Sequence, residues 1–227
     1  AQRAPEFVST FAAARRAIFV SPPLLDRAVS LGTDRTNCEF IPNGVDTELF
    51  TPGGTDRAAQ FLFVGNLAPV KGADRITSIW PAIQTAVPAA RLDIVGVGPL
   101  QDELEKASSP GTLILHGQRS RREVAEMMRS AAVLLVPSRS ESWGVVVLEA
   151  QASGTPVVAA DVGGLPYSVG TGGTLVDTSD EFAIPHLFAE AVLPWVEGPV
   201  NRGQLVERAK AYSWDEIARL EREAMGC

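Results

Sequence analysis

Two glutamates eight residues apart, Glu141 and Glu149, flank the start of an expected helix in the segment PSRSESWGVVVLEA. Residues Gly144 to Val146 lie between them, and the first N–H groups of a helix have no partner within it and attract anions. A rise of 1.5 Å per residue separates the two carboxylates by about 12 Å along the axis. Phosphates on the amides and hydroxyl groups at each carboxylate fit this pattern, which is the shape of a nucleotide diphosphate sugar. Both acids could instead be ordinary helix residues, but Glu149 stands in the apolar run VVVLEAQA, which favours a function.

Three other loops contain residues of chemical interest. The first is GNLAPVKG, where Gly65 permits a tight turn and Lys71, at an expected helix start, could hold an anion or be a solvated lysine. The second is Gly96-Val97-Gly98-Pro99, which lacks the third glycine of a dinucleotide fingerprint because Gln101 stands there, so NAD is disfavoured. The third contains His116, which has no nucleophile motif near it and is interpreted as a loop or core residue.

These loops follow short apolar runs that alternate with amphipathic segments. We expect strands at 60–64, 91–95, 112–115, 133–136, 156–159 and 173–176, and helices at 72–85, 99–106, 120–130, 144–153 and 180–192. An earlier strand (17–21), helix (24–31) and strand (39–45) precede them, and helices at 202–211 and 214–224 follow. The alternation predicts an α/β fold with a doubly wound parallel sheet, in which ligands bind beyond the carboxyl ends of the strands.

Composition excludes several classes of protein. The chain has 227 residues, of which 45% are hydrophobic and 21% charged, so it can form a globular core. Its formal net charge of −7 argues against nucleic-acid binding, and its apolar runs are too short to span a membrane. The two cysteines cannot form a disulfide framework, which favours a reducing, cytoplasmic setting.

Taken together, these stretches resemble the donor-binding half of glycosyltransferase family 4, also called group 1, whose retaining enzymes contain two Rossmann domains in the GT-B arrangement. The stretches that carry the resemblance run from Ile41 to Glu221: IPNGVDTELFTP, FVGNLAPVKG, IVGVGPLQDELEK, HGQRS, VPSRSESWGVVVLEAQASGTPVVAADVGGLP and YSWDEIARLE.

The resemblance implies a role for each matching residue. Glu141 would bind sugar hydroxyls and Glu149 the ribose, while the amides of Gly144, Val145 and Val146 would meet the diphosphate. Lys71 would neutralise charge on the leaving diphosphate, so Lys71 and Glu141 are the expected catalytic residues. Gly65 and Asn66 would also contact the donor, a UDP- or GDP-sugar. The base pocket would be lined by Gly96, Gly98, Pro99 and the backbone around Arg119. No cofactor or metal is expected, in keeping with the lack of a DxD-like motif.

The resemblance also implies a division of the chain. Residues 1–54 would be the remnant of an N-terminal acceptor-side domain with its linker, 55–211 the donor domain, and 212–227 a helix that crosses back to the N-terminal half. The acceptor-binding domain would be a missing partner through which the enzyme could associate with a membrane. Without it, the expected hexosyltransferase would bind donor weakly and transfer nothing.

Asn66 departs from the family pattern, which usually has an arginine there. Arg139 or Arg119 could supply the missing charge, or the chain could be a catalytically weak or inactive nucleotide-sugar-binding module. A nucleotide-sugar epimerase is a further alternative that the context of Glu141 and Glu149 disfavours. Tyr167 is a second departure, at a position where an acidic residue is common.

We expect Asn66→Arg to tighten binding of a nucleoside diphosphate several-fold, because a charge-assisted hydrogen bond is roughly twice as strong as a neutral one. Isothermal titration of both forms with UDP measures the change. Equal affinities would show that the missing charge has no effect.

Overall fold

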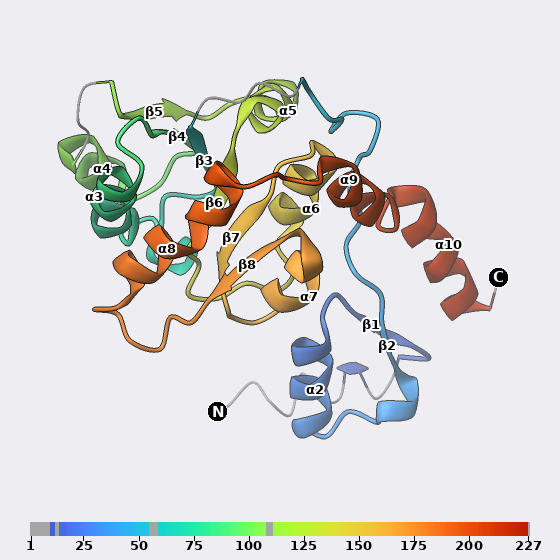
Figure 1. Cartoon of the computed structure of the whole chain (residues 1–227). Coiled ribbons are helices and arrows are strands. Elements are labelled where there is room, and N and C mark those ends of the chain that lie inside the picture. The colour runs from blue at the N-terminus through green and yellow to red at the C-terminus, as the bar shows by residue number, and fades with distance from the viewer. Residues whose placement is uncertain (1–9, 12–13, 55–58, 108–110, 227) are drawn as a thin grey trace.

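The computed structural model describes residues 10–11, 14–54, 59–107 and 111–226. Its main body is a six-stranded parallel sheet with helices on both faces (Figure 1). This arrangement confirms the Rossmann-like α/β fold predicted from the alternation of strands and helices.

The sheet reverses its winding direction at its centre. Its strands, in chain order, are β3 (Gln60–Val64), β4 (Arg91–Val95), β5 (Leu113–Gly117), β6 (Val133–Val136), β7 (Val157–Ala160) and β8 (Gly173–Val176). Their order in space is β5-β4-β3-β6-β7-β8. The chain therefore moves outward from β3 to β5, returns to β6 on the other side of β3, and then moves outward again. A reversal of this kind separates the loops that follow the two central strands and leaves a crevice between them.

Each face of the sheet has its own hydrophobic core. Phe61 and Phe63 point from β3 into the core on one face, whereas Leu62 points into the core on the other. The first face is covered by α3 (Ile76–Ala86), α4 (Gln101–Ala107) and α8 (Ile184–Glu197). The second is covered by α5 (Arg121–Ser130), α6 (Val145–Ala152), α7 (Leu165–Val169) and α9 (Arg202–Lys210) (Figure 1). The short helices η2 (Pro69–Lys71) and η3 (Gly170–Gly172) lie in loops. Buried apolar side chains on both faces explain why the strands are nearly uninterrupted apolar runs.

The N-terminal segment forms a separate small unit. It contains β1 (Ala17–Phe19), α2 (Pro22–Ser30), η1 (Arg35–Asn37) and β2 (Cys38–Phe40), and its two strands pair in parallel. The linker that follows contacts the end of the chain, because Val45 bridges to Ser213 and Ile41 packs on Ile217 of α10 (Trp214–Met225). The proposed limits 1–54, 55–211 and 212–227 stay predictions, and the first of these boundaries adjoins residues 55–58, which lie outside the described part.

Several predicted boundaries were wrong; the helix predicted at 180–192, for example, spans Ile184–Glu197. The helix predicted at 72–85 begins at Ile76, because Gly72 has a left-handed φ of 69° and ends the short helix η2, so Lys71 does not stand at the start of α3. The helix predicted from Pro99 begins at Gln101, and the Leu100 N–H before it bonds the Leu67 carbonyl in the loop after β3. The strand predicted at 39–45 ends at Phe40. Helix α7 was not predicted, since its five residues are too few to show a helical period.

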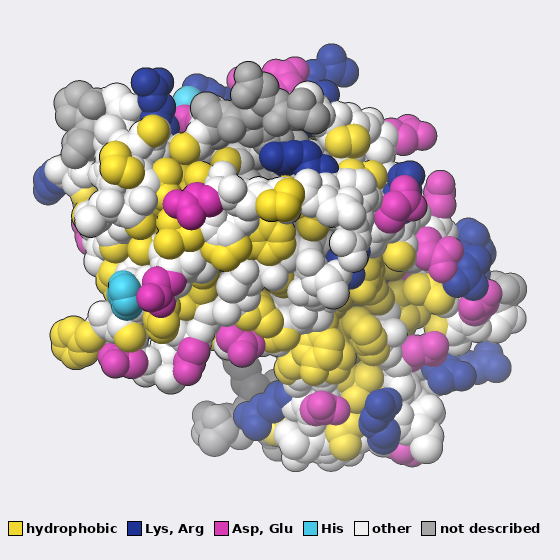
Figure 2. All heavy atoms as spheres, in the orientation of Figure 1, with side chains coloured by type: hydrophobic (Ala, Val, Ile, Leu, Met, Phe, Trp, Pro, Cys, Tyr) yellow, Lys and Arg dark blue, Asp and Glu magenta, His cyan; other side chains and the backbone are white. Residues whose placement is uncertain are grey.

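Basic and acidic side chains are interspersed over the face shown in Figure 2. Cys38 is a buried free thiol, whereas Cys227 lies outside the described residues. Among the helices that the structure describes, none combines the length and the apolar character that crossing a bilayer requires.

Gly44→Ala is expected to weaken the packing of α10 against the linker after β2. A Cβ atom at Gly44 would lie 2.7 Å from the Trp214 ring and 3.2 Å from Ile217. Such overpacking costs about 1–3 kcal/mol, which thermal unfolding and hydrogen exchange of α10 would detect. The control is Gly203→Ala on α9, where the nearest atom is 3.6 Å away and stability should hold or rise. Equal effects of the two changes would contradict this packing.

Candidate functional site

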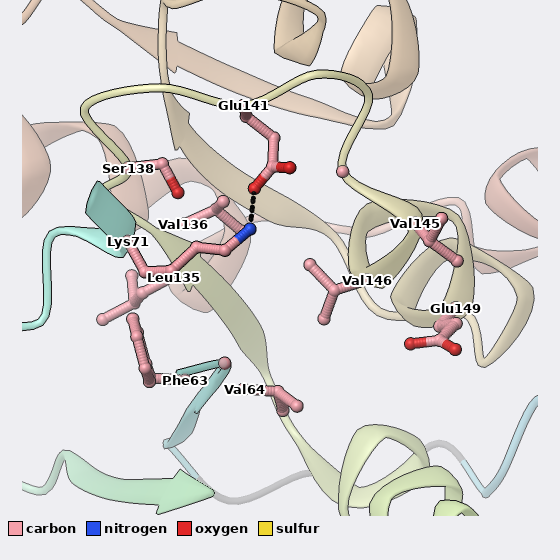
Figure 3. A pocket seen from close by; sticks show the side chains of 12 residues that line it. Phe63, Val64, Lys71, Leu135, Val136, Ser138, Glu141, Val145, Val146 and Glu149 are labelled. Atoms are coloured by element: carbon pink, nitrogen blue, oxygen red, sulfur yellow. Dashed lines mark hydrogen bonds and ion pairs between the residues drawn. The ribbon is translucent and has the colours of Figure 1, made fainter. Parts of the chain in front are cut away.

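A cavity of about 310 Å³ opens where the sheet reverses, between the carboxyl ends of β3 and β6 (Figure 3). Its walls come from the two central strands, the loop after each of them, and the start of α6. The lining residues are Phe63, Val64, Gly65, Lys71, Leu135, Val136, Ser138, Glu141, Gly144, Val145, Val146 and Glu149. Seven of the predicted donor-binding residues are therefore gathered in one cavity: Gly65, Lys71, Glu141, Gly144, Val145, Val146 and Glu149.

Lys71 and Glu141 face each other across this cavity. The Lys71 Nζ lies 2.5 Å from Glu141 Oε2, and the lysine side chain is 35% exposed whereas that of the glutamate is 12% exposed (Figure 3). The lysine comes from η2 and the glutamate from the loop after β6, 70 residues later. The pair therefore joins the two loops and brings one positive and one negative group to the same point.

Helix α6 begins beside this pair, directly after Gly144. This glycine has φ 85°, and a Cβ atom on it would lie 2.8 Å from the Leu165 side chain, so a larger residue is disfavoured both by its backbone and by its contacts. The left-handed turn directs the start of α6 toward the cavity. The first N–H groups of α6 have no acceptor within the helix and favour an anion at this end.

Glu149 occupies the far end of the same cavity, one turn into α6. Its side chain is 17% exposed, and Arg121 Nη2 lies 3.9 Å from its Oε1. Burial raises the pKa of Glu149; the positive charge of Arg121 opposes this shift and the negative charge of Asp46 adds to it. Arg121 also lies 3.8 Å from Asp46, so the linker after β2 reaches this end of the cavity. Neither Arg121 nor Asp46 was predicted as a site residue, because no local sequence pattern links either to Glu149.

A second hollow of about 360 Å³ adjoins the first and shares Val64 and Gly65 with it. A Cβ atom built on Gly65 would lie 3.7 Å from the Phe63 ring and 3.9 Å from the Lys71 side chain, which are ordinary contact distances. The second hollow is lined by Val64, Gly65, Asn66, Val95, Gly96, Val97, Gln118, Arg119 and Val124. Of the predicted base-pocket residues it contains Gly96 and Arg119. Gly98 packs against the Asn66 side chain instead, and Pro99 lines neither hollow.

The two arginines expected to replace the missing charge at position 66 differ in their surroundings. Arg139 Nη1 donates to Asp74 Oδ1 at 2.7 Å and to the Pro69 carbonyl at 3.0 Å, and Arg139 does not line the cavity. Its bond to Asp74 raises the pKa of Arg139. Arg119 lines the second hollow together with Asn66, 3.7 Å from Glu123. Arg119 is therefore the better placed of the two.

His116 lies at the end of β5, outside the main cavity. Its Nε2 is 2.6 Å from Oδ1 of the buried Asp93, which also accepts from Gln60. Across the described ranges, no three His, Cys, Asp or Glu residues come close enough together to hold a metal ion.

The fold and the paired hollows at the strand reversal define a Rossmann-like domain whose cleft offers positive groups and helix amides between two carboxylates. The sequence matches the family described as Glycosyl transferases group 1 over residues 58–194. The chain belongs to this glycosyltransferase family, as its sequence motifs indicated.

Curated proteins that are similar to this chain are also glycosyltransferases. The chain is 37% identical over 206 residues to a D-inositol 3-phosphate glycosyltransferase of Mycolicibacterium smegmatis. The aligned region covers 80% of this chain and 45% of the relative. It is 31% identical over 238 residues to D-inositol 3-phosphate glycosyltransferase 1 of Catenulispora acidiphila, with 92% and 56% covered. The chain thus spans about half the length of these relatives.

Solved structures share the fold. Anabaena HepE in complex with UDP and glucose matches with a TM-score of 0.81 at 17% identity, over 99% of this chain and 67% of that one. The pneumococcal O-GlcNAc transferase GtfA in complex with UDP and GlcNAc matches with a TM-score of 0.81 at 19% identity, over 99% and 47%.

Glu149→Gln is expected to stabilise the folded chain at neutral pH. Because burial raises the pKa of Glu149 above its usual value of 4.5, its charge costs stability as the pH rises above that value. The amide removes this cost, so thermal unfolding between pH 4 and pH 8 should show an advantage that grows with pH. The exposed Glu126 on α5 provides the control variant Glu126→Gln, which should show no such trend. An advantage of Glu149→Gln that shrinks as the pH rises would contradict the assignment.

Proposed function

We propose that this chain is the donor-binding part of a retaining hexosyltransferase that uses a UDP- or GDP-sugar. The observation that carries the proposal is the continuity of two hollows across Val64 and Gly65, with Glu141 and Glu149 on either side of the start of α6. An elongated ligand with a charged centre matches this arrangement, since the Lys71 ammonium and the amides at the start of α6 lie beside two carboxylates that can accept hydroxyl hydrogen bonds.

In this proposal each part of the donor has its own contacts. The diphosphate lies on the amides of Gly144 to Val146 and beside Lys71, and the ribose hydroxyls donate to Glu149. The sugar hydroxyls donate to Glu141, and the base enters the hollow lined by Gly96 and Arg119. The ligand would pass from one hollow to the other at Val64 and Gly65, which line both.

The proposed chemistry depends on charge. As the bond between the sugar and the diphosphate breaks, its electron pair goes to the diphosphate oxygen, and negative charge builds up beside Lys71 and the start of α6. Groups already oriented toward that charge stabilise it more in the transition state than in the bound donor, which lowers the barrier. Retention of configuration is proposed from the likeness of the sequence to family 4 enzymes.

Lys71 must exchange partners for this to happen. In the structure its ammonium bonds Glu141, so each group neutralises the other. A diphosphate would compete with Glu141 for the ammonium, and the freed carboxylate would become available to sugar hydroxyls. Binding of the diphosphate at Lys71 and binding of the sugar hydroxyls at Glu141 would then be coupled through this one ion pair.

A second candidate function is a nucleotide-sugar-binding module with little or no turnover. The observation that favours it is Asn66, which lines the second hollow without the charge that family members usually have at this position. Transfer of sugar by the full-length enzyme separates this candidate from the first, since both predict donor binding.

We expect UDP or GDP to bind the purified chain and NAD not to bind, as measured by isothermal titration with UDP, GDP, ADP and NAD. Lys71→Met should weaken nucleoside diphosphate binding at least about tenfold, because a hydrogen bond to a charged group contributes roughly 1.5–3 kcal/mol. Lys106→Met, at an exposed position on α4, is the matched control and should bind as the wild type does. Binding of NAD without binding of UDP or GDP would refute the proposed function.

A further inference from the structure

Arg75 is a buried arginine that the proposed donor contacts do not use. It stands immediately before α3, and its side chain is only 6% exposed. Its Nη1 donates to the carbonyl oxygen of Pro137 at 3.0 Å and to that of Ser138 at 3.4 Å. Its Nη2 and Nε donate to the two carboxylate oxygens of Glu181 at 2.5 and 3.2 Å. One guanidinium therefore binds two separate segments of the chain.

The first of these segments is the loop that carries Glu141. Pro137 and Ser138 begin that loop, and both residues are buried. Arg75 itself follows Lys71 by four residues, through the turn at Gly72. The guanidinium is thus a direct link between the segment that supplies the lysine and the segment that supplies the glutamate.

Backbone contacts show how closely these two segments approach. The Arg139 N–H donates to the Val70 carbonyl at 3.0 Å. A Cβ atom on Gly72 would lie 1.9 Å from the carbonyl oxygen of Pro137, the same oxygen that accepts from Arg75. The contact between Gly72 and Pro137 therefore prevents the two segments from moving closer, and the bond from Arg75 to the Pro137 carbonyl prevents them from moving apart.

The second segment is the loop between β8 and α8, which contains Glu181. This carboxylate is 55% exposed, and the bond from Arg75 is the main reason that its pKa is lowered. It holds the guanidinium from the solvent side with two parallel bonds, which fix the plane of the group. Arginine can satisfy a carboxylate and two carbonyls at once because its donors form a rigid fork, whereas lysine offers a single point charge.

We propose that Arg75 is a positioning residue that holds Lys71 and Glu141 at the spacing needed to bind the diphosphate and sugar of the donor, with Glu181 orienting its guanidinium. The expected effect on donor binding rests on the proposed function. Removal of the guanidinium leaves the two buried carbonyls without a charged donor. The loop after β6 then loses one of its side-chain attachments to the segment before α3, and the bond from Arg139 to Asp74 remains.

The test compares Arg75→Met, Arg75→Lys and Glu181→Gln with a matched control, Arg202→Met. Arg202 is a partly buried arginine that donates to the Gly154 carbonyl at 2.8 Å, and it lines neither hollow. Two measurements are made on the 227-residue chain: hydrogen–deuterium exchange of peptides covering 69–75 and 137–144, and isothermal titration with UDP.

We expect Arg75→Met to speed exchange in both peptides and to weaken UDP binding about tenfold, while Arg75→Lys recovers part of each effect. Glu181→Gln should have a smaller effect, since the bonds to the carbonyls remain. Arg202→Met should lower the unfolding temperature with less than about twofold change in UDP affinity.

The exchange measurement separates this inference from the proposed function. If the wild type binds neither UDP nor GDP, the proposed function fails, and faster exchange confined to 69–75 and 137–144 in Arg75→Met or Arg75→Lys still supports a positioning role. If Arg75→Met does not fold, Arg75→Lys provides both measurements. Exchange and UDP affinity that change no more in the Arg75 variants than in Arg202→Met would overturn the inference.

Discussion

The reversal of winding between β3 and β6 is the constraint on which the cleft depends. It sends the loops after two neighbouring strands in opposite directions, so the sheet itself does not hold them together. Besides the Lys71–Glu141 pair, three contacts hold these loops together: the backbone bond between Arg139 and Val70, the ion pair of Arg139 with Asp74, and the bonds from the Arg75 guanidinium to the carbonyls of Pro137 and Ser138. The cleft is therefore a product of side chains that bridge the gap and not of the sheet alone.

Charge in this region is balanced locally. The chain carries a net charge of −7, yet Lys71, Arg75 and Arg139 all lie near the cleft, each beside a carboxylate. Such pairing keeps buried cations from being left uncompensated, which would cost far more than the pairs contribute. An anionic ligand consequently has to compete with a carboxylate for each cation. Lys71 is the cation that lines the cavity, so this competition centres on Glu141.

Much of the fold could be predicted from the sequence, because the central strands are apolar runs that need no partner to be recognised. Strands β3, β4 and β6 begin and end where the pattern predicts. The position of Lys71 before α3 could not be predicted in the same way, since the turn at Gly72 is set by a carbonyl in a distant loop. Likewise, the bonds of Arg75 join residues 62 and 106 positions apart, and no local pattern signals them. The grouping of Glu141 and Glu149 was readable because both lie near one helix start. The pairing of Arg121 with Glu149 depends on how α5 packs beside α6.

The close approach of Gly72 to Pro137 also bears on how related sequences should be interpreted. Lys71 and Gly72 are adjacent but are constrained by different contacts. The lysine lines the cavity, whereas position 72 must be glycine because a Cβ atom there would clash with the Pro137 carbonyl. A relative that had lost all transferase activity would still need the glycine in order to fold in this way. The glycine is thus required by the backbone alone, and a relative could change the lysine before it without altering the close approach of Gly72 to Pro137.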